Sequence, residues 1–180
     1  MEKTLPLRQP KALQDRLLRT TLVILRVVQY LSAAAGAIAA GIVPAFWLLP
    51  DLADRLLKKS PEPDTLTSNT VLLLTIAIAA ALTFVMLAHL IKVVKTVGDG
   101  NAFTTENAIR LRKIAYLSLG ILASEFVLAW IGYFYHESTR DGLRWFDWDP
   151  SSIITILVLF VMARVFEEGV RLNDEAQFTV

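Results

Sequence analysis

Four ionisable side chains lie within or at the edge of long apolar stretches, and these are Arg26, His89, Glu125 and Arg164. An ionisable group at membrane depth is costly, so it normally faces a partner or a water-filled cavity. Glu125 follows Ile114 by eleven residues, roughly 16 Å into its stretch at about 1.5 Å per residue. We expect Glu125 to pair with one of the other three. Such a cluster has two interpretations, a proton or ion relay and a structural ion pair that fixes helix register.

No other catalytic chemistry is indicated by the sequence. There is no HExxH motif, no GxSxG motif and no cysteine, so the familiar zinc, serine and thiol settings are missing. The two histidines, His89 and His136, are expected near opposite membrane faces, where they cannot share a metal. A net charge of +1 gives no basic field of the kind that binds nucleic acid. We predict no enzymatic activity, no cofactor, no metal and no direct nucleic-acid contact.

Four apolar segments carry these residues, at about 21–49, 70–95, 112–135 and 151–172. About 20 apolar residues cross a hydrocarbon core of roughly 30 Å. The fourth segment reaches that length only if its helix continues past Arg164. The second is apolar all round and lacks the polar stripe of a helix in a soluble bundle. The sequence predicts an all-α, integral membrane four-helix bundle, a single domain over residues 1–180.

The first segment has one alternative interpretation, a cleaved signal peptide. A basic start and an apolar run precede the small residues 32–36, as in such peptides. The apolar run continues to Leu49, however, and Arg26 interrupts its start. We therefore expect a membrane span.

The distribution of lysine and arginine predicts the orientation. Thirteen of the 18 lie before or at the start of the first span, around the loop 96–111, or near the C-terminus, and five lie in the loops 50–69 and 136–150. Cytoplasmic segments carry such an excess, so both termini and the loop 96–111 are predicted to be cytoplasmic. Aromatic residues gather near the two outer loops, as in an interfacial belt or, alternatively, a ligand-binding box: Trp47, Tyr133, Tyr135, Trp145, Phe146 and Trp148.

Small residues recur at intervals of four in the first span, at Ser32, Gly36 and Ala40. This spacing lets two helix backbones approach closely. It permits either a homo-oligomer interface or packing within one chain, and we favour the second.

The middle loop and the C-terminal tail have the most specific sequences. Gly98, Asp99 and Gly100 end one helix, and Thr104 is then the expected N-cap of the next, with Glu106 favourably placed in its first turn. The glycines do not form a phosphate loop, because no GKS or GKT follows. The tail is acidic and ends in an apolar tripeptide, Phe178-Thr179-Val180.

NAFTTENAIRLRKIA in the loop and VFEEGVRLNDEAQFTV in the tail together resemble a bacterial membrane family, domain of unknown function 2975. The matching loop positions are Asn101, Phe103, Thr104, Glu106, Asn107, Arg110, Leu111 and Arg112. The matching tail positions are Phe166, Gly169, Leu172, Asp174, Thr179 and Val180. Ala102 departs from the family pattern, in which proline is common. The resemblance implies four spans in the bacterial inner membrane. Because genes of this family often adjoin one for a helix-turn-helix regulator, it also suggests a cytoplasmic protein partner.

These patterns lead to three hypotheses. The first is a membrane sensor or regulator that binds a cytoplasmic partner, such as a helix-turn-helix regulator, through the loop 98–113 and the tail 166–180. The second is a small transporter or channel-like component that uses Glu125 and the arginines. The third is a structural subunit of a larger membrane complex. For the first hypothesis the alternative is that loop and tail simply pack on each other.

Overall fold

The computed structural model describes residues 11–48, 63–135 and 150–177. These residues form four helices, α1 (Lys11–Leu48), α3 (Pro63–Gly98), α4 (Thr105–Tyr135) and α5 (Pro150–Gln177). The described residues contain no strand. The predicted all-α class with four helices is confirmed.

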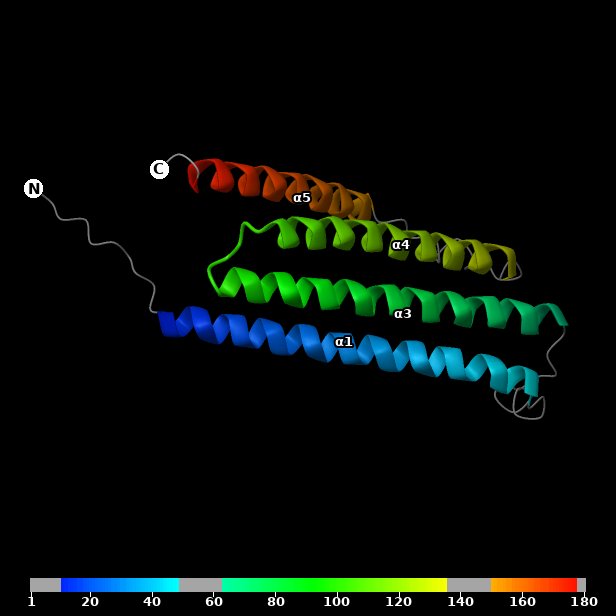
Figure 1. The fold of residues 1–180 in the computed structure, drawn as a ribbon. Helices are drawn as coiled ribbons and strands as arrows, with labels where there is room; N and C mark the ends of the chain where they lie inside the picture. Colours follow the sequence, from blue (N-terminus) through cyan, green and yellow to red (C-terminus); the bar gives the residue numbers. More distant parts are fainter. Residues whose placement is uncertain (1–10, 49–62, 136–149, 178–180) are drawn as a thin grey trace, which may run out of the picture.

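The helices lie in a row, in the order of the chain (Figure 1). Within the described ranges α1 packs against α3, α3 against α4, and α4 against α5, whereas α1 touches neither α4 nor α5. The helices alternate in direction, so α1 begins, α3 ends, α4 begins and α5 ends at one end of the molecule (Figure 1). We call this the loop end, because it carries the α3–α4 loop. The first described helix thus begins, and the last one ends, at the same end of the molecule (Figure 1).

Three helices are long and apolar enough to cross a membrane, over Arg16–Ala45, Asn69–Gly98 and Thr105–Trp130. Large apolar side chains, such as those of Ile24 and Ile78, remain exposed along these helices. Continuous exposed apolar surface of this kind is unfavourable in water and fits contact with lipid. The chain is therefore a multi-pass membrane protein.

The fourth predicted span, 151–172, is not among these helices. Its uncharged stretch ends at Ala163, and Arg164, Glu167, Glu168 and Arg171 follow within two turns. At about 1.5 Å per residue this stretch covers about 20 Å, short of a hydrocarbon core of roughly 30 Å. The prediction of a fourth span is therefore not confirmed.

The close contact between α1 and α3 accounts for the small residues of the first span. A Cβ atom added at Gly36 would lie 3.0 Å from the Cβ of Ala80. Beside it, the Ser32 hydroxyl donates to the carbonyl of Ala80 over 2.8 Å, and Gln29 Nε2 donates to the carbonyl of Phe84 over 3.2 Å. Gly36 and Ser32 therefore serve packing within one chain, the interpretation that the sequence favoured.

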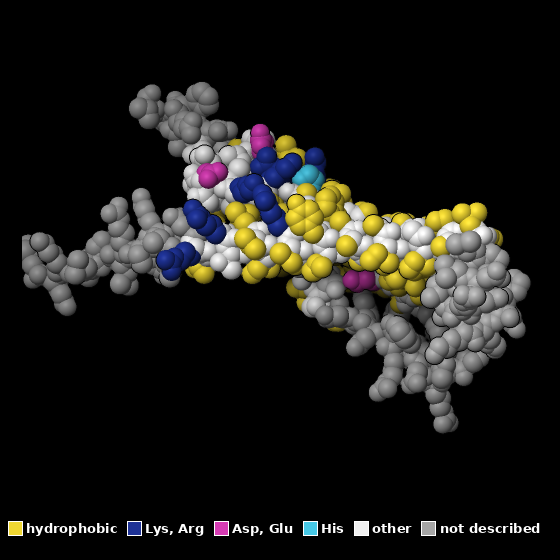
Figure 2. Space-filling view, turned by 90° about the horizontal axis from the view of Figure 1, so that it is seen from below, with side chains coloured by type: hydrophobic (Ala, Val, Ile, Leu, Met, Phe, Trp, Pro, Cys, Tyr) yellow, Lys and Arg dark blue, Asp and Glu magenta, His cyan; other side chains and the backbone are white. Residues whose placement is uncertain are grey.

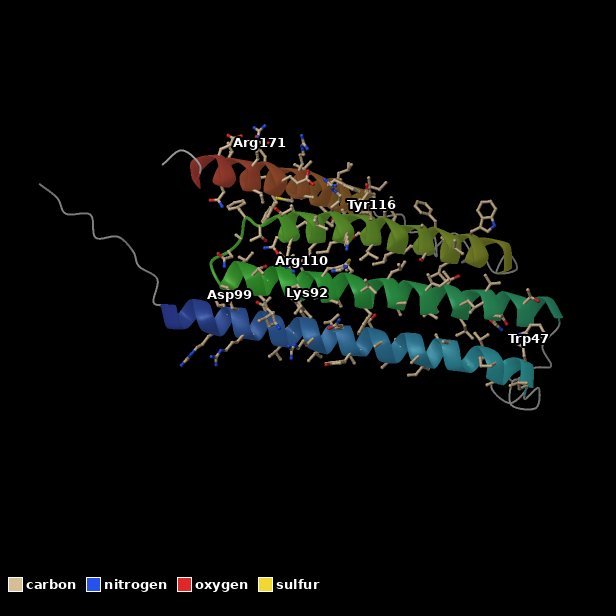
Figure 3. All side chains as sticks on the ribbon, in the orientation of Figure 1. Trp47, Lys92, Asp99, Arg110, Tyr116 and Arg171 are labelled. Atoms are coloured by element: carbon tan, nitrogen blue, oxygen red, sulfur yellow. The ribbon has the colours of Figure 1, made fainter. Side chains whose placement is uncertain are left out.

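The best-packed part of the molecule lies where α3, α4 and α5 meet near the loop end. Val93, Leu111, Ile114 and Ala163 form a buried apolar cluster there, with Phe166 packed against it. At the other end, the Trp47 ring nitrogen donates to the Thr70 hydroxyl over 3.2 Å (Figure 3). The remaining residues of the predicted aromatic belt lie outside the side chains that the structure describes.

Candidate functional site

The turn between α3 and α4 is built from its own backbone. The amide of Asp99 donates to the carbonyl of Lys95 over 3.0 Å, and the amide of Gly100 donates to that of Val97 over 3.1 Å. Gly100 has a φ of 84°, in the left-handed region where a side chain is disfavoured. The sequence Gly98-Asp99-Gly100 thus ends α3 as predicted and turns the chain back toward α4.

Thr104 caps α4, as the sequence predicted. Its hydroxyl accepts from the amide of Asn107 over 3.3 Å, and its carbonyl accepts from the amides of Asn107 and Ala108. Glu106 lies in the first turn, where its charge complements the helix dipole, and it pairs with Arg110 over 2.5 Å. These contacts fix the start of α4.

Asn107 is the hub of the turn and is fully buried. Its Nδ2 donates to the carbonyls of Ala102, over 3.0 Å, and Asn101, over 3.4 Å. Its Oδ1 accepts from Thr96 Oγ1 over 2.8 Å and from an Arg110 guanidinium nitrogen over 3.0 Å. One side chain therefore joins the end of α3, the turn and the start of α4. Thr96 was missed by the sequence reasoning, because its only signal is a hydroxyl one turn from a helix end.

Phe103 attaches this turn to α5. Its ring centroid lies 5.3 Å from that of Phe166, with the planes tilted by 39°. A Cβ atom at Gly169 would lie 2.5 Å from Phe103 Cδ1. A glycine is therefore needed at position 169 so that the Phe103 ring can rest against α5. Phe103 of the loop motif is thus in direct contact with Phe166 and Gly169 of the tail motif.

Ion pairs surround this contact. Arg112 of α4 pairs with Glu167 of α5, and Arg164 approaches the same carboxylate to 3.4 Å. Further along α5, Arg171 pairs with Glu168 over 2.5 Å and with Glu175 over 3.7 Å. Figure 3 shows Arg171 at the same end of the molecule as Asp99 and Arg110. We call residues 98–113 and 166–177 together the loop–tail unit.

Loop and tail therefore pack on each other, which was the alternative weighed against a partner surface. The unit includes every residue predicted for that surface except Thr179 and Val180, which lie outside the described residues. The backbone of Asp174 belongs to α5, but its side chain is not described. Phe103 remains 50% exposed, so docking on α5 covers only part of its ring. The unit is both a structural joint and an accessible surface.

The expected polar cluster around Glu125 is not formed among the described residues. Arg26 lies on α1, which does not contact α4 or α5. Arg164 lies midway along α5, eight residues beyond Ile156, which lines a groove together with Glu125, and it pairs with Glu167 instead. The four residues would meet in a closed bundle, whereas the described helices lie in a row and do not bring them together.

Glu125 instead borders a groove between α4 and the first turns of α5, of about 240 Å³. Hydroxyl groups of Ser118, Ser152 and Thr155 line the same groove. The Glu125 side chain is exposed and has no ion pair within the described part of the chain. Nor do three His, Asp or Glu side chains converge there to hold a metal.

Comparison with known proteins gives one match. The model of a family described as "Protein of unknown function (DUF2975)" matches residues 55–180. This range contains α3, α4, α5 and the whole loop–tail unit. No curated protein and no solved structure matches the chain.

Proposed function

Since the chain belongs to the family of unknown function DUF2975, as its two motifs indicated, we propose that it is a membrane sensor or regulator. The loop–tail unit binds a protein partner at the cytoplasmic face, and the membrane helices hold the unit there. The observation that carries the proposal is the docking of Phe103 between Phe166 and Gly169. It makes a defined surface out of two segments distant in the sequence.

The geometry of α5 supports this role. Gly169 lies against Phe103, which precedes the start of α4. The last residues of α5, 170–177, therefore extend past the first residues of α4 (Figure 1). A charged helical end that extends past the start of the neighbouring helix is accessible to a protein in solution.

The surface has the composition of an interface. Phe103 is 50% exposed and Leu172 is 55% exposed. Leu172 follows Gly169 by one helical turn, so it lies on the side of α5 that faces Phe103. Glu168 and Arg171 adjoin Gly169 and Leu172 in the sequence of α5 and pair with each other, and Arg112 of α4 pairs with Glu167. An apolar centre with a polar rim is typical of protein interfaces.

The charges favour a basic partner. Glu106, Glu168 and Glu175 are 75%, 47% and 64% exposed, and exposed ion pairs contribute only about 0–1 kcal/mol. Their arginines can therefore be exchanged for cations of a partner at little cost. A helix-turn-helix regulator presents such cations on its DNA-binding surface, so binding here competes with DNA.

Binding between the purified chain and a helix-turn-helix regulator from a neighbouring gene tests the proposal. Leu172→Asp is expected to weaken binding at least tenfold, because it places a charge in the apolar centre. Leu17→Asp is the matched control, since Leu17 is 62% exposed on α1, outside the unit. Equal binding by wild type, by Leu172→Asp and by a chain truncated after residue 172 would reject the proposal.

The transporter hypothesis receives less support. It requires a polar path through Glu125 and the arginines, and the described helices do not bring these residues together. Flux into liposomes that is abolished by Glu125→Gln would favour it over the partner hypothesis. A structural subunit would instead bind a membrane protein through the exposed faces of its helices, and Leu172→Asp would leave that binding unchanged.

A further inference from the structure

Cations from two neighbouring helices converge close to the loop end. Lys113, Lys92 and Arg110 all act electrostatically on the imidazole of His89. Lys92 follows His89 by three residues on α3, and Lys113 follows Arg110 by three residues on α4. Residues at this spacing lie on one side of a helix. Each helix therefore contributes a pair of residues to one cluster, which we call the basic cluster.

The register of the two helices fixes where Lys113 lies. Thr96 contacts Asn107, and Met86 contacts Ser118. In an antiparallel pair with these contacts, Lys113 lies level with residues 90–91 of α3, between His89 and Lys92. The two lysines thus flank the same point on the α3–α4 seam, and Figure 3 shows Lys92 beside Arg110 there.

The positive charge of this cluster is largely uncompensated. Arg110 has Glu106 as its partner, but neither Lys92 nor Lys113 has an ion pair within the described ranges. Both lysines are exposed. Like charges held close together repel, so the arrangement favours binding of an anion.

The position of the cluster identifies the anion. Lys92 lies six residues before the end of the candidate span Asn69–Gly98, about 9 Å along the helix. Leu117 lies one turn deeper than Lys113 on α4, Val85 lies two turns deeper than Lys92 on α3, and Val85 is 42% exposed. Cations above an apolar seam match a phospholipid, whose phosphate lies above its acyl chains. Figure 2 shows Lys and Arg gathered at this end, with apolar side chains along most of the remaining described surface.

We propose that Lys92 and Lys113, assisted by Arg110, bind the phosphate of an anionic phospholipid in the leaflet at the loop end. Lysine ammonium groups donate charge-assisted hydrogen bonds to phosphate oxygens. The apolar seam below them accommodates an acyl chain. Because Arg110 also donates to Asn107, the bound lipid contacts the hub of the loop–tail unit through one side chain.

Lipid binding to the purified full-length chain, followed by native mass spectrometry, tests this proposal. Wild type is expected to retain phosphatidylglycerol in preference to phosphatidylcholine. A cation beside an anionic headgroup contributes roughly fivefold to affinity, so Lys92→Gln/Lys113→Gln should weaken phosphatidylglycerol binding about 30-fold. Lys92→Arg/Lys113→Arg should restore most of it, which separates loss of charge from loss of fold.

The matched control is Arg16→Gln/Arg19→Gln. These two arginines are exposed on α1 near the loop end and form no ion pair among the described residues. Their loss should change binding by less than about threefold. An equal effect of both double substitutions would overturn the site, because it would show general charge attraction. Displacement of the lipid by millimolar inorganic phosphate would overturn it too, in favour of a free-ion site.

Discussion

Replacing Asn107 by alanine should loosen the whole loop–tail unit. The Asn107 side chain is fully buried, and its Nδ2 is the donor to the carbonyls of Ala102 and Asn101. Alanine leaves both carbonyls without this partner. A buried acceptor left fully unsatisfied costs about 1–3 kcal/mol. The Ala102 carbonyl keeps the amide of Thr104 as a donor over 3.2 Å, and Asn101 is exposed enough for water to replace part of its loss, so the lower part of this range applies.

The two other contacts of Asn107 cost less when they are lost. Thr96 Oγ1 also lies 2.9 Å from the carbonyls of Lys92 and Val93, so its hydroxyl proton has other acceptors. Arg110 keeps its pair with Glu106. The sum is a loss of about 1–3 kcal/mol of unfolding free energy, carried mainly by the lost hydrogen bonds of Nδ2 and the emptied volume.

Two assays measure this loss. The first is thermal unfolding of the purified protein in detergent. The second uses the absence of cysteine from the chain. A single Ala102→Cys substitution then reports opening of the turn through its rate of reaction with a maleimide. A local loss of 2 kcal/mol corresponds to about a 30-fold faster reaction.

Asn101→Ala is the matched control, because Asn101 is exposed and its hydrogen bonds within the described part of the chain are made by its backbone amide and carbonyl. It should change stability by no more than about 0.5 kcal/mol. Asn107→Asp keeps the acceptor but loses the Nδ2 donor, so most of the effect of alanine should remain. If Asn107→Ala behaves like Asn101→Ala in both assays, the role assigned to this hub is refuted.

Three further substitutions have defined outcomes. Gly169→Ala should displace the Phe103 ring and lower the unfolding free energy by about 0.5–1.5 kcal/mol in thermal unfolding. In a Phe103→Ala background the same substitution should cost little, and additive losses would contradict the contact. Gly36→Val should separate α1 from α3 and cost about 1–3 kcal/mol, whereas Gly41→Val, with nothing within 4 Å, should not; equal losses would disprove the close approach. Glu125→Gln should leave thermal stability unchanged or raise it, and a loss above about 1 kcal/mol would reveal an ion pair.

The sequence predicted local structure correctly where a short stretch of residues determines its own conformation. Thr104 and Glu106 are a cap and a first-turn acid whatever surrounds them, and the structure has both. Gly98 to Gly100 end α3 for the same kind of reason. The apolar segments likewise predicted helices, because backbone groups in lipid must be satisfied within the segment.

Contacts between helices were not predictable in the same way. Periodicity states which side of a helix is apolar but not which helix lies next to it. The described helices do not bring Arg26 to Glu125 for that reason, since a row separates α1 from α4 where a closed bundle would not. Gly169 could be predicted only as part of the tail motif. The ring that requires a glycine there, Phe103, lies 66 residues away in the chain.

The most direct test of the account is a cross-link across the loop–tail unit in intact membranes. Phe103→Cys/Gly169→Cys places the only two thiols of the chain at the observed contact. A short bifunctional maleimide should join them efficiently, whereas Trp47→Cys/Gly169→Cys, at opposite ends of the molecule (Figure 3), should not react in this way. If neither pair is joined within single chains, the loop and the tail are not docked in the membrane, and the surface proposed for partner binding does not exist.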